Sequence, residues 1–252
     1  MSDPLFSAGL LFAVGLVAGV LNVIAGGGSF LTLPVLIFLG LPATLANGTN
    51  RLAIITQNVG AVWSFHRKGL ISRPWLRIGV PASMIGAALG TVAAVVIGDL
   101  AFQRILALMM VSITAWTIWH PLPKAVDSIV EPPSGRRRMA FIAAFFVVGI
   151  YGGFVQAGVG FMILALTTAG GLDLIRGNAV KVTLVLLFTP LAVIVFAATS
   201  KVNWPMAISL AAGNYVGGLL GVHVQVLKGH AWVRNVVTVT IIVFAVKLLT
   251  GG

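Results

Sequence analysis

Residues 4–50 read PLFSAGLLFAVGLVAGVLNVIAGGGSFLTLPVLIFLGLPATLANGTN, without one Asp, Glu, Lys or Arg. A helix needs about 20 apolar residues to cross the hydrocarbon core of a bilayer, so this run is long enough for more than one membrane segment. Three consecutive glycines at 26–28 interrupt the run, and each lowers helix stability by about 1 kcal/mol relative to alanine. The stretch therefore predicts a membrane protein whose first apolar run is divided at these glycines.

The composition of the whole chain agrees with this prediction. Of its 252 residues, 59% are hydrophobic and 8% are charged, whereas soluble domains are about a quarter charged. This excludes an ordinary soluble domain and also a disordered chain, which needs low hydrophobicity. The net charge of +11 comes from basic residues between apolar runs, so we interpret them as membrane-topology signals and expect no nucleic acid partner. The chain has no cysteine, which excludes disulfides and iron–sulfur clusters.

We expect apolar membrane segments in two groups, one on each side of a polar linker. They are residues 5–24, 28–41, 43–65, 75–97 and 101–119, and then 139–157, 159–172, 174–199, 204–224 and 231–250. The segments 28–41 and 159–172 are too short to cross comfortably, so each is expected to form a hairpin with its predecessor, bent at glycines. The expected organisation is an N-terminal repeat (1–119), a basic cytoplasmic linker (120–138) and a C-terminal repeat (139–252).

The two halves carry similar residues at similar spacing. A shift of 131 residues aligns Asn47 with Asn178, Pro74 with Pro205, Gly86 with Gly217, and Gly90 with Gly221. Basic residues place the loop after segment 43–65 in the cytoplasm, whereas the corresponding loop near Lys201 has one base and is expected outside. An odd number of segments per half then inverts one half relative to the other. The predicted fold is an all-α polytopic membrane protein of two inverted-topology repeats with glycine-broken helices, a pattern typical of secondary transporters.

Polar residues and glycines lie at both predicted breaks. They are Asn22, Gly27, Gly28 and Ser29 in the first half, and Gln156, Gly158 and Gly160 in the second. A broken helix frees backbone N–H groups at the start of the next half-helix, and such a positive helix end binds anions. Membrane helices also use glycine for close packing, so this alternative stays open.

A second group of polar residues lies inside predicted membrane segments. It comprises Asn47, Thr49, Asn50, Arg51 and Gln57 in the first half. Asn178 and Lys181 occupy similar positions in the second half. At 1.5 Å per residue, Arg51 and Lys181 lie about 10 Å from the ends of their segments. We expect these two cations to flank a central anion site. The alternative is that both side chains snorkel to the nearest headgroups.

Other kinds of site are not predicted. All five acidic residues fall at segment ends or in loops, which argues against a proton relay or a sodium site inside the membrane: Asp3, Asp99, Asp127, Glu131 and Asp173. The four histidines lack metal-ligand spacing, and the glycine cluster lacks the Lys-Ser/Thr of a phosphate-binding loop. We therefore expect no catalytic residue, no metal and no cofactor. An inside-negative potential drives anions outward by about 2.3 kcal/mol per charge at 100 mV, which favours export or facilitated diffusion.

Short motifs give the chain a family resemblance. The glycine-rich break, Ala-Asn-Gly-Thr-Asn-Arg (46–51) and Phe-His-Arg-Lys-Gly (65–69) resemble the sulfite exporter TauE/SafE family, also called the 4-toluene sulfonate uptake permease family. Gly-Asn-Ala-Val-Lys-Val (177–182) resembles the weaker second copy of that motif. The resemblance implies transport of sulfite, sulfonates and related sulfur-containing organic anions across the bacterial inner membrane. It also implies functional importance for residues 47, 49, 50 and 51, and for 178 and 181.

The combined interpretation is a secondary transporter of small anions that works by alternating access, not an enzyme. Its expected partners are a small anionic substrate and membrane lipids, and the chain could form a homodimer. A passive anion channel lined by the same residues is the first alternative. An integral-membrane enzyme or a non-transport assembly subunit is the second, although the sequence offers neither a metal site nor a nucleophile–base pair.

Overall fold

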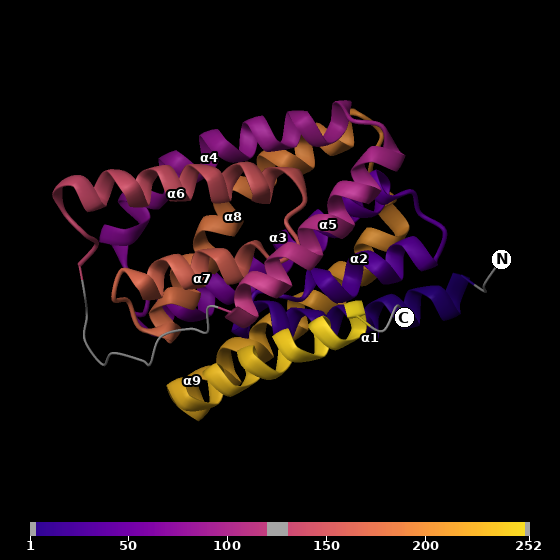
Figure 1. Cartoon of the computed structure of the whole chain (residues 1–252). Coiled ribbons are helices and arrows are strands. Elements are labelled where there is room, and N and C mark those ends of the chain that lie inside the picture. Colours follow the sequence, from indigo (N-terminus) through magenta and orange to yellow (C-terminus); the bar gives the residue numbers. More distant parts are fainter. Residues whose placement is uncertain (1–3, 120–130, 250–252) are drawn as a thin grey trace.

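The computed structural model describes residues 4–119 and 131–249, and within these ranges all regular structure is helical (Figure 1). This confirms the all-α prediction for the described part of the chain. The helices are α1 (Pro4–Ile24), α2 (Ser29–Phe38), α3 (Ala43–Arg67), α4 (Arg73–Val96), α5 (Asp99–Trp119), α6 (Gly135–Phe154), α7 (Val159–Ala169), α8 (Leu174–Ala198) and α9 (Trp204–Leu249).

Among the residues that the structure describes, five stretches are long and apolar enough to cross a bilayer, as expected of a multi-pass membrane protein. They are Leu5–Ile24, Arg73–Val96, Gly135–Phe154, Leu174–Ala198 and Trp204–Lys228. Helix α3 is equally long, but many of its buried residues are polar, which lowers its hydropathy. Buried polar groups in such a helix need partners inside the protein, so α3 is expected to lie at the centre of the bundle.

The two shortest helices, α2 and α7, cannot cross a membrane alone. They contain 10 and 11 residues, which corresponds to about 15 Å along the axis, half of the roughly 30 Å hydrocarbon core. The chain is non-helical at residues 25–28, before α2, and at 155–158, before α7. The helices within the expected segments 28–41 and 159–172 are therefore too short to cross the hydrocarbon core alone.

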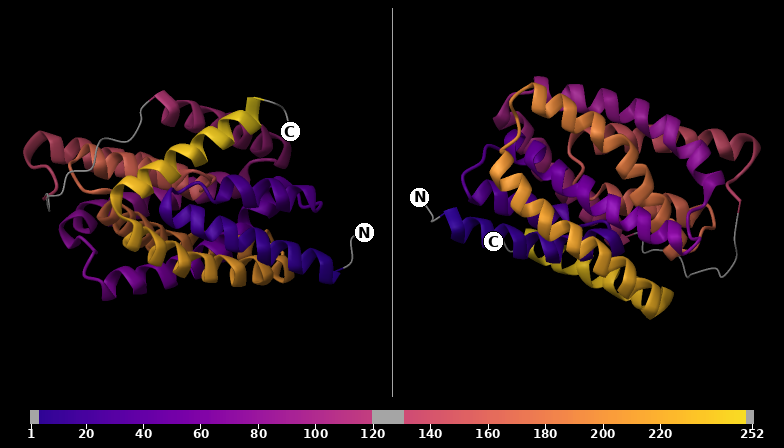
Figure 2. Two further views of the ribbon diagram at one scale, coloured as in Figure 1. Left: turned by 90° about the horizontal axis from the view of Figure 1, so that it is seen from below. Right: turned by 180° about the vertical axis from the view of Figure 1, so that it is seen from behind.

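The end of the chain differs from the prediction. Segments 204–224 and 231–250 were expected to be separate, but both belong to α9, whose ribbon bends sharply back on itself (Figures 1 and 2). Only one glycine, Gly229, and no proline lie between the expected segments, so backbone hydrogen bonding can continue through the bend. Helix α6 begins at Gly135, inside the predicted linker 120–138. Residues 120–130 lie outside the described part.

The most extensive helix contacts join the two halves of the sequence: α1 packs along α9, and α4 packs along α6. Glycines make the close approach possible, as is common between membrane helices. A Cβ atom at Gly15 of α1 would lie 2.5 Å from the carbonyl oxygen of Leu210 in α9, and one at Gly86 of α4 would overlap the Phe146 carbonyl of α6. Helix α3 contacts α9, α8 contacts α4, and α3 and α8 contact each other, so these two helices join the α1–α9 pair to the α4–α6 pair.

We expect the substitution Gly15→Ala to lower the melting temperature of the purified protein, because forcing a methyl group into a packed helix contact costs about 1–3 kcal/mol. The matched control is Gly9→Ala in the same helix, where an added Cβ would meet nothing within 4 Å. Because alanine favours helix more than glycine does, the control should be at least as stable as the wild type. Equal melting temperatures for the two variants would contradict the packing argument.

Candidate functional site

The two non-helical breaks touch each other. A Cβ atom at Gly26, whose φ is +96°, would overlap the backbone of Gly160, and one at Gly160 would overlap Gly26. Only glycine allows backbones to approach this closely. The start of α7 is thereby packed directly against the break that precedes α2.

A small polar cavity lies beside this crossing. Its volume is about 10 Å³, which is the space of a single water molecule. Six of the predicted site residues line it, together with Asn58 and the apolar residues Ile54, Val159, Val182 and Val185: Asn22, Ser29, Gln57, Gln156, Gly160 and Lys181. The structure therefore brings these six predicted residues together around one cavity.

The helices that start at the two breaks have no side-chain cap. Gly28 precedes α2 and Gly158, with φ +76°, precedes α7, and neither N-terminus receives a side-chain capping bond. Some N–H groups of these first turns donate to carbonyls of the breaks, as Phe161 does to Gly158 at 3.0 Å, and the aligned peptide dipoles place partial positive charge at both helix starts. Ser29 and Gly160 from these first turns line the cavity, so two positively polarised helix ends lie at its wall.

A chain of amides leads to the cavity from the first half of the sequence. Asn22 Nδ2 donates to Gln57 Oε1 at 3.2 Å, and Gln57 Nε2 donates to Asn58 Oδ1 at 3.4 Å. Asn58 Nδ2 is buried and has no partner. The chain therefore ends in one free donor on a side chain that lines the cavity.

Gln156 supplies a free acceptor from the second half. Its φ is +67°, an uncommon conformation for a residue other than glycine that is found preferentially at functional sites. Its Nε2 donates to Thr189 Oγ1 at 2.8 Å, while the Thr189 hydroxyl itself donates to the Val185 carbonyl at 2.6 Å. This arrangement fixes the orientation of the amide, and it leaves the buried Oε1 of Gln156 without a partner.

Lys181 also lines the cavity, but its three N–H groups are already used. Its Nζ donates to the carbonyls of Asn22 at 2.9 Å and Val23 at 2.8 Å, and to Asn178 Oδ1 at 2.6 Å. Asn178 Nδ2 in turn donates to the carbonyl of Ile24 at 2.9 Å. These carbonyls form the negative end of α1, so helix α8 caps the end of α1 with one cation and one amide.

Arg51 of α3 caps the C-terminal end of α6 in the same way. Its guanidinium donates to the carbonyls of Gly152 at 2.9 Å, Gly153 at 2.5 Å and Phe154 at 3.2 Å. Asn47 Nδ2 adds a bond to the Phe154 carbonyl at 2.9 Å, and Arg51 lies over the ring of Phe196 at 5.0 Å. Arg51 and Lys181 are both fully buried, so the snorkelling alternative is wrong for both, and Arg51 does not line the cavity.

The remaining predicted residues contact residues around the cavity or neighbouring helices without lining the cavity themselves. Asn50 Nδ2 donates to Ser29 Oγ at 3.1 Å, and Thr49 accepts a bond from the backbone N–H of Asn203 at 2.9 Å. Gly28 packs against the backbone of Ala18, which is the close-packing role of glycine. Eight predicted residues lie outside the cavity lining: Gly27, Gly28, Asn47, Thr49, Asn50, Arg51, Gly158 and Asn178.

Three partners of the site were not predicted from the sequence. They are Thr189, which holds Gln156, Phe196, which packs on Arg51, and Gln225, which accepts a 2.8 Å bond from Asn178. Thr189 precedes a proline inside an apolar helix, a local irregularity that could have drawn attention to it. Neither Phe196 nor Gln225 has a comparable signal in the sequence.

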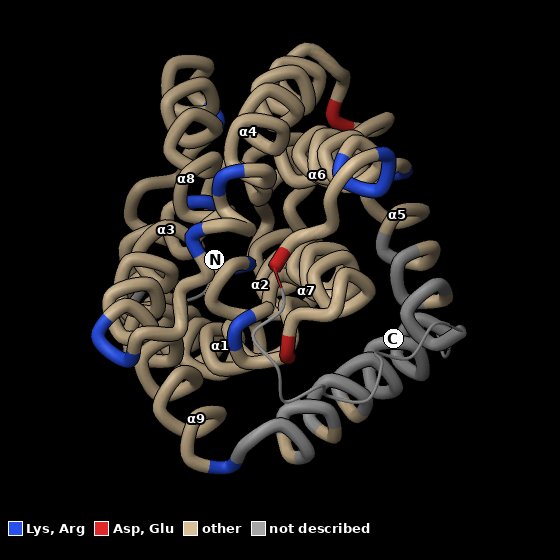
Figure 3. Tube along the Cα trace, turned by 90° about the vertical axis from the view of Figure 1, so that its left-hand side faces the viewer, with Lys and Arg blue, Asp and Glu red and all other residues tan. Residues whose placement is uncertain are grey.

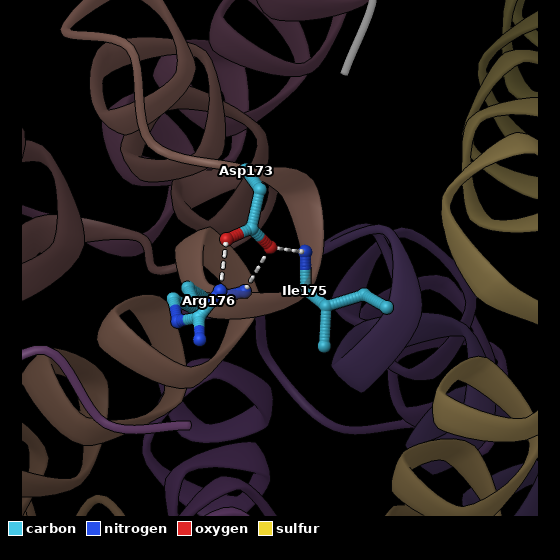
Figure 4. Close-up of polar contacts among 3 residues, drawn as sticks. All are labelled: Asp173, Ile175 and Arg176. Atoms are coloured by element: carbon cyan, nitrogen blue, oxygen red, sulfur yellow. Dashed lines mark hydrogen bonds and ion pairs between the residues drawn. The ribbon is translucent and has the colours of Figure 1, made fainter. Parts of the chain in front are cut away.

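The acidic residues that the structure describes lie away from the cavity. Asp173 caps the start of α8, where it accepts bonds from the N–H groups of Ile175 and Arg176 and pairs with the Arg176 side chain at 3.1 Å (Figure 4). Asp99 accepts bonds from Ala43 and Thr44 at the start of α3. Both lie at helix ends, as predicted, whereas Asp3 and Asp127 lie outside the described residues. Within the described ranges, no three His, Cys, Asp or Glu side chains are grouped as metal ligands would be.

Residues 11–248 match the family model of the sulfite exporter TauE/SafE proteins. The chain belongs to this family. It is 26% identical to a probable membrane transporter protein of Haemophilus influenzae over 95% of this chain and 93% of that protein. It is also 26% identical to the probable membrane transporter protein YfcA of Escherichia coli K12, over 99% and 91% of the two chains, and to the probable membrane transporter protein ORF9 of a Sinorhizobium species, over 95% and 91%. No solved structure matches the chain.

We expect Arg51→Gln to destabilise the protein strongly. The substitution removes bonds from a charged donor, each worth about 1.5–3 kcal/mol, and leaves buried carbonyls at the end of α6 without partners. The control is Arg67→Gln at the exposed end of the same helix, where the guanidinium lies over the Trp63 ring at 5.0 Å and its loss should cost only about 0.5–1 kcal/mol. Thermal unfolding in detergent measures both, and an Arg51→Gln variant as stable as Arg67→Gln would refute the capping role.

Proposed function

We propose that the protein is a secondary transporter that carries small anions, of the sulfite and organosulfonate class, across the bacterial inner membrane by alternating access. The observation that supports this most is the central cavity, where two uncapped helix N-termini and Lys181 surround a polar space. Positive helix ends and an ammonium group favour an anion. Membership of the sulfite exporter TauE/SafE family supports the choice of sulfur oxyanions.

The two capping arrangements support inverted repeats. Asn178 and Lys181 of α8 bind the end of α1, and Asn47 and Arg51 of α3 bind the end of α6. The same pair of residue types thus performs the same task in each half, on the other half's first helix. A site between two inverted repeats with broken helices is the arrangement found in many secondary transporters.

The size of the cavity favours alternating access over a channel. A space of about 10 Å³ admits one water molecule and not a sulfur oxyanion, so the helices around it must separate before an anion can enter. The α1–α9 and α4–α6 pairs are tightly packed within themselves, and they contact each other mainly through α3 and α8. We expect these two pairs to rock against each other as units. In a passive channel, by contrast, the same residues would line a continuous pore.

The free polar atoms of the cavity favour a protonated monoanion. Asn58 Nδ2 needs an acceptor, whereas Gln156 Oε1 needs a donor. Hydrogensulfite offers both oxygen acceptors and one hydrogen-bond donor, while the sulfite and sulfate dianions and the sulfonate group of an organosulfonate offer acceptors alone, so we expect hydrogensulfite to bind best within the proposed class. An unsatisfied buried acceptor costs about 1–3 kcal/mol, so we expect a preference of about tenfold or more for the protonated form.

The binding test measures thermal stabilisation of purified protein by sulfite, sulfate, sulfonates and carboxylates, below and above the second pKa of sulfite. A ligand at 100 times its dissociation constant stabilises by about 2.7 kcal/mol, and we expect this for sulfite at the lower pH. Asn58→Leu should abolish the effect. Asn214→Leu is the control, because Asn214 is a buried amide of α9 that is not part of the cavity lining. Equal stabilisation of both variants would exclude this cavity as the binding site.

The transport test uses proteoliposomes with a potassium-diffusion potential as the only driving force. An electrogenic anion transporter should show saturable sulfite flux that follows the potential, because each charge gains about 2.3 kcal/mol per 100 mV. Preloaded unlabelled sulfite should accelerate entry of labelled sulfite by counterflow. Flux without counterflow would favour the channel, and chemical turnover of the anion would favour an enzyme.

A further inference from the structure

A second, larger cavity lies between the first turns of α4 and α6, at the end of α6 that is far from the central site. Its volume is about 360 Å³. Arg77 of α4 and Arg138 of α6 line it together with Glu131 and Ser134, and Pro74 and Ile78 form part of an apolar wall. None of these residues belongs to the proposed transport site.

The lining carries an excess of positive charge. Its lining residues include two arginines, Arg77 and Arg138, and one acid, Glu131. Across the described part of the chain the one ion pair is Arg176 with Asp173, so neither cavity arginine forms one with an acid there. Figure 3, which looks onto this end of the molecule, shows Lys and Arg at the ends of several helices and few Asp or Glu. Guanidinium groups bind phosphate oxygens in pairs of parallel hydrogen bonds, so two of them suit a phosphate group.

The position of the cavity along α6 fits the headgroup layer. Arg138 precedes the end of α6 at Phe154 by a helical stretch of about 24 Å. A central site near the middle of the membrane is about 15 Å from the edge of the hydrocarbon core. Even with a tilt of 40°, α6 therefore carries Arg138 past that edge. The abundance of Lys and Arg at this end indicates the cytoplasmic side.

Exposed apolar residues continue from the cavity along α6. Met139, next to Arg138, is 65% exposed, and Val147, two turns further on, is 57% exposed. Apolar side chains exposed on a membrane helix contact acyl chains. A ligand with a phosphate in the cavity and hydrocarbon beside it would meet both surfaces, whereas a free inorganic anion would use only the first.

We propose that this cavity binds the phosphodiester headgroup of an anionic phospholipid of the cytoplasmic leaflet. Arg77 and Arg138 bind the phosphate oxygens, and Glu131 and Ser134 bind hydroxyl groups of a glycerol headgroup. Basic pockets between membrane helices are known to select such headgroups. The proposal does not depend on which solute the central cavity takes.

The test compares the double variants Arg77→Gln/Arg138→Gln and Arg136→Gln/Arg137→Gln. Both remove two positive charges from the same end of the molecule, but only the first pair lines the cavity. Native mass spectrometry and thermal shifts in detergent are recorded with short-chain phosphatidylglycerol, phosphatidylcholine or inorganic phosphate. At about fivefold in affinity per basic residue, we expect the cavity variant to bind phosphatidylglycerol about 30-fold more weakly than the wild type. The matched variant should bind nearly as well as the wild type.

Three outcomes would overturn the proposal. Equal losses in the two variants would mean that general positive charge attracts the lipid. Equal binding of phosphatidylcholine would remove the preference for anionic lipid, and equal stabilisation by inorganic phosphate would make the cavity a free-anion site. If the double variant does not fold, the single variants Arg77→Lys and Arg138→Lys retain the charge but lose the paired guanidinium geometry. Undiminished phosphatidylglycerol binding by both would refute recognition by Arg77 and Arg138.

Discussion

The carbonyl groups at the broken ends of α1 and α6 impose the main constraint on this structure. In a bilayer, a backbone group without a hydrogen bond costs several kcal/mol, and water is not available to supply the missing partner. Lys181 and Asn178 bind the carbonyls of one end, and Arg51 and Asn47 bind those of the other. Each cap comes from the other half of the sequence, so the breaks can exist only when the two halves are assembled. The central polar cavity is a consequence of that assembly.

The capping of the C-terminal ends of α1 and α6 also determines which partial charges remain around the central cavity. The break leaves a negative helix end and a positive helix end near each other, at Ile24 and Ser29 in the first half. Cationic side chains neutralise the negative end, while the positive ends of α2 and α7 receive no side-chain cap. The two helix N-termini without side-chain caps, which carry partial positive charge, lie beside the small polar cavity. Under the proposed function, the helix breaks, which would be unfavourable in lipid without these caps, also supply the positive helix ends that attract an anion.

Local signals in the sequence predicted both helix breaks and singled out the two buried cations, but they did not show which groups those cations bind. Glycine lowers helix stability and permits left-handed backbone conformations whatever the tertiary structure, so the glycines at 26–28, 158 and 160 allowed both breaks to be located. Arg51 and Lys181 stood out because a charge inside an apolar run must be paired. Their partners are carbonyl groups, which every residue has, so the sequence could not distinguish binding to a helix end from binding to an anion. The boundary of α9 was misplaced for a related reason, since one glycine does not determine whether a helix bends or ends.

The two buried cations are not equivalent, and the difference bears on the proposed transport cycle. Arg51 is held by three carbonyls and by the ring of Phe196, and it does not line the cavity. Lys181 lines the cavity, with a flexible side chain whose three donors hold Asn22, Val23 and Asn178. Under the proposed function, an anion that enters the cavity competes with the end of α1 for the Lys181 ammonium group. Binding of the anion then weakens the contact between α8 and α1, while the rigid, planar guanidinium keeps α3 attached to α6. Substrate binding would in this way loosen one connection between the helix pairs and leave the other intact, which is what a rocking movement about a fixed contact requires.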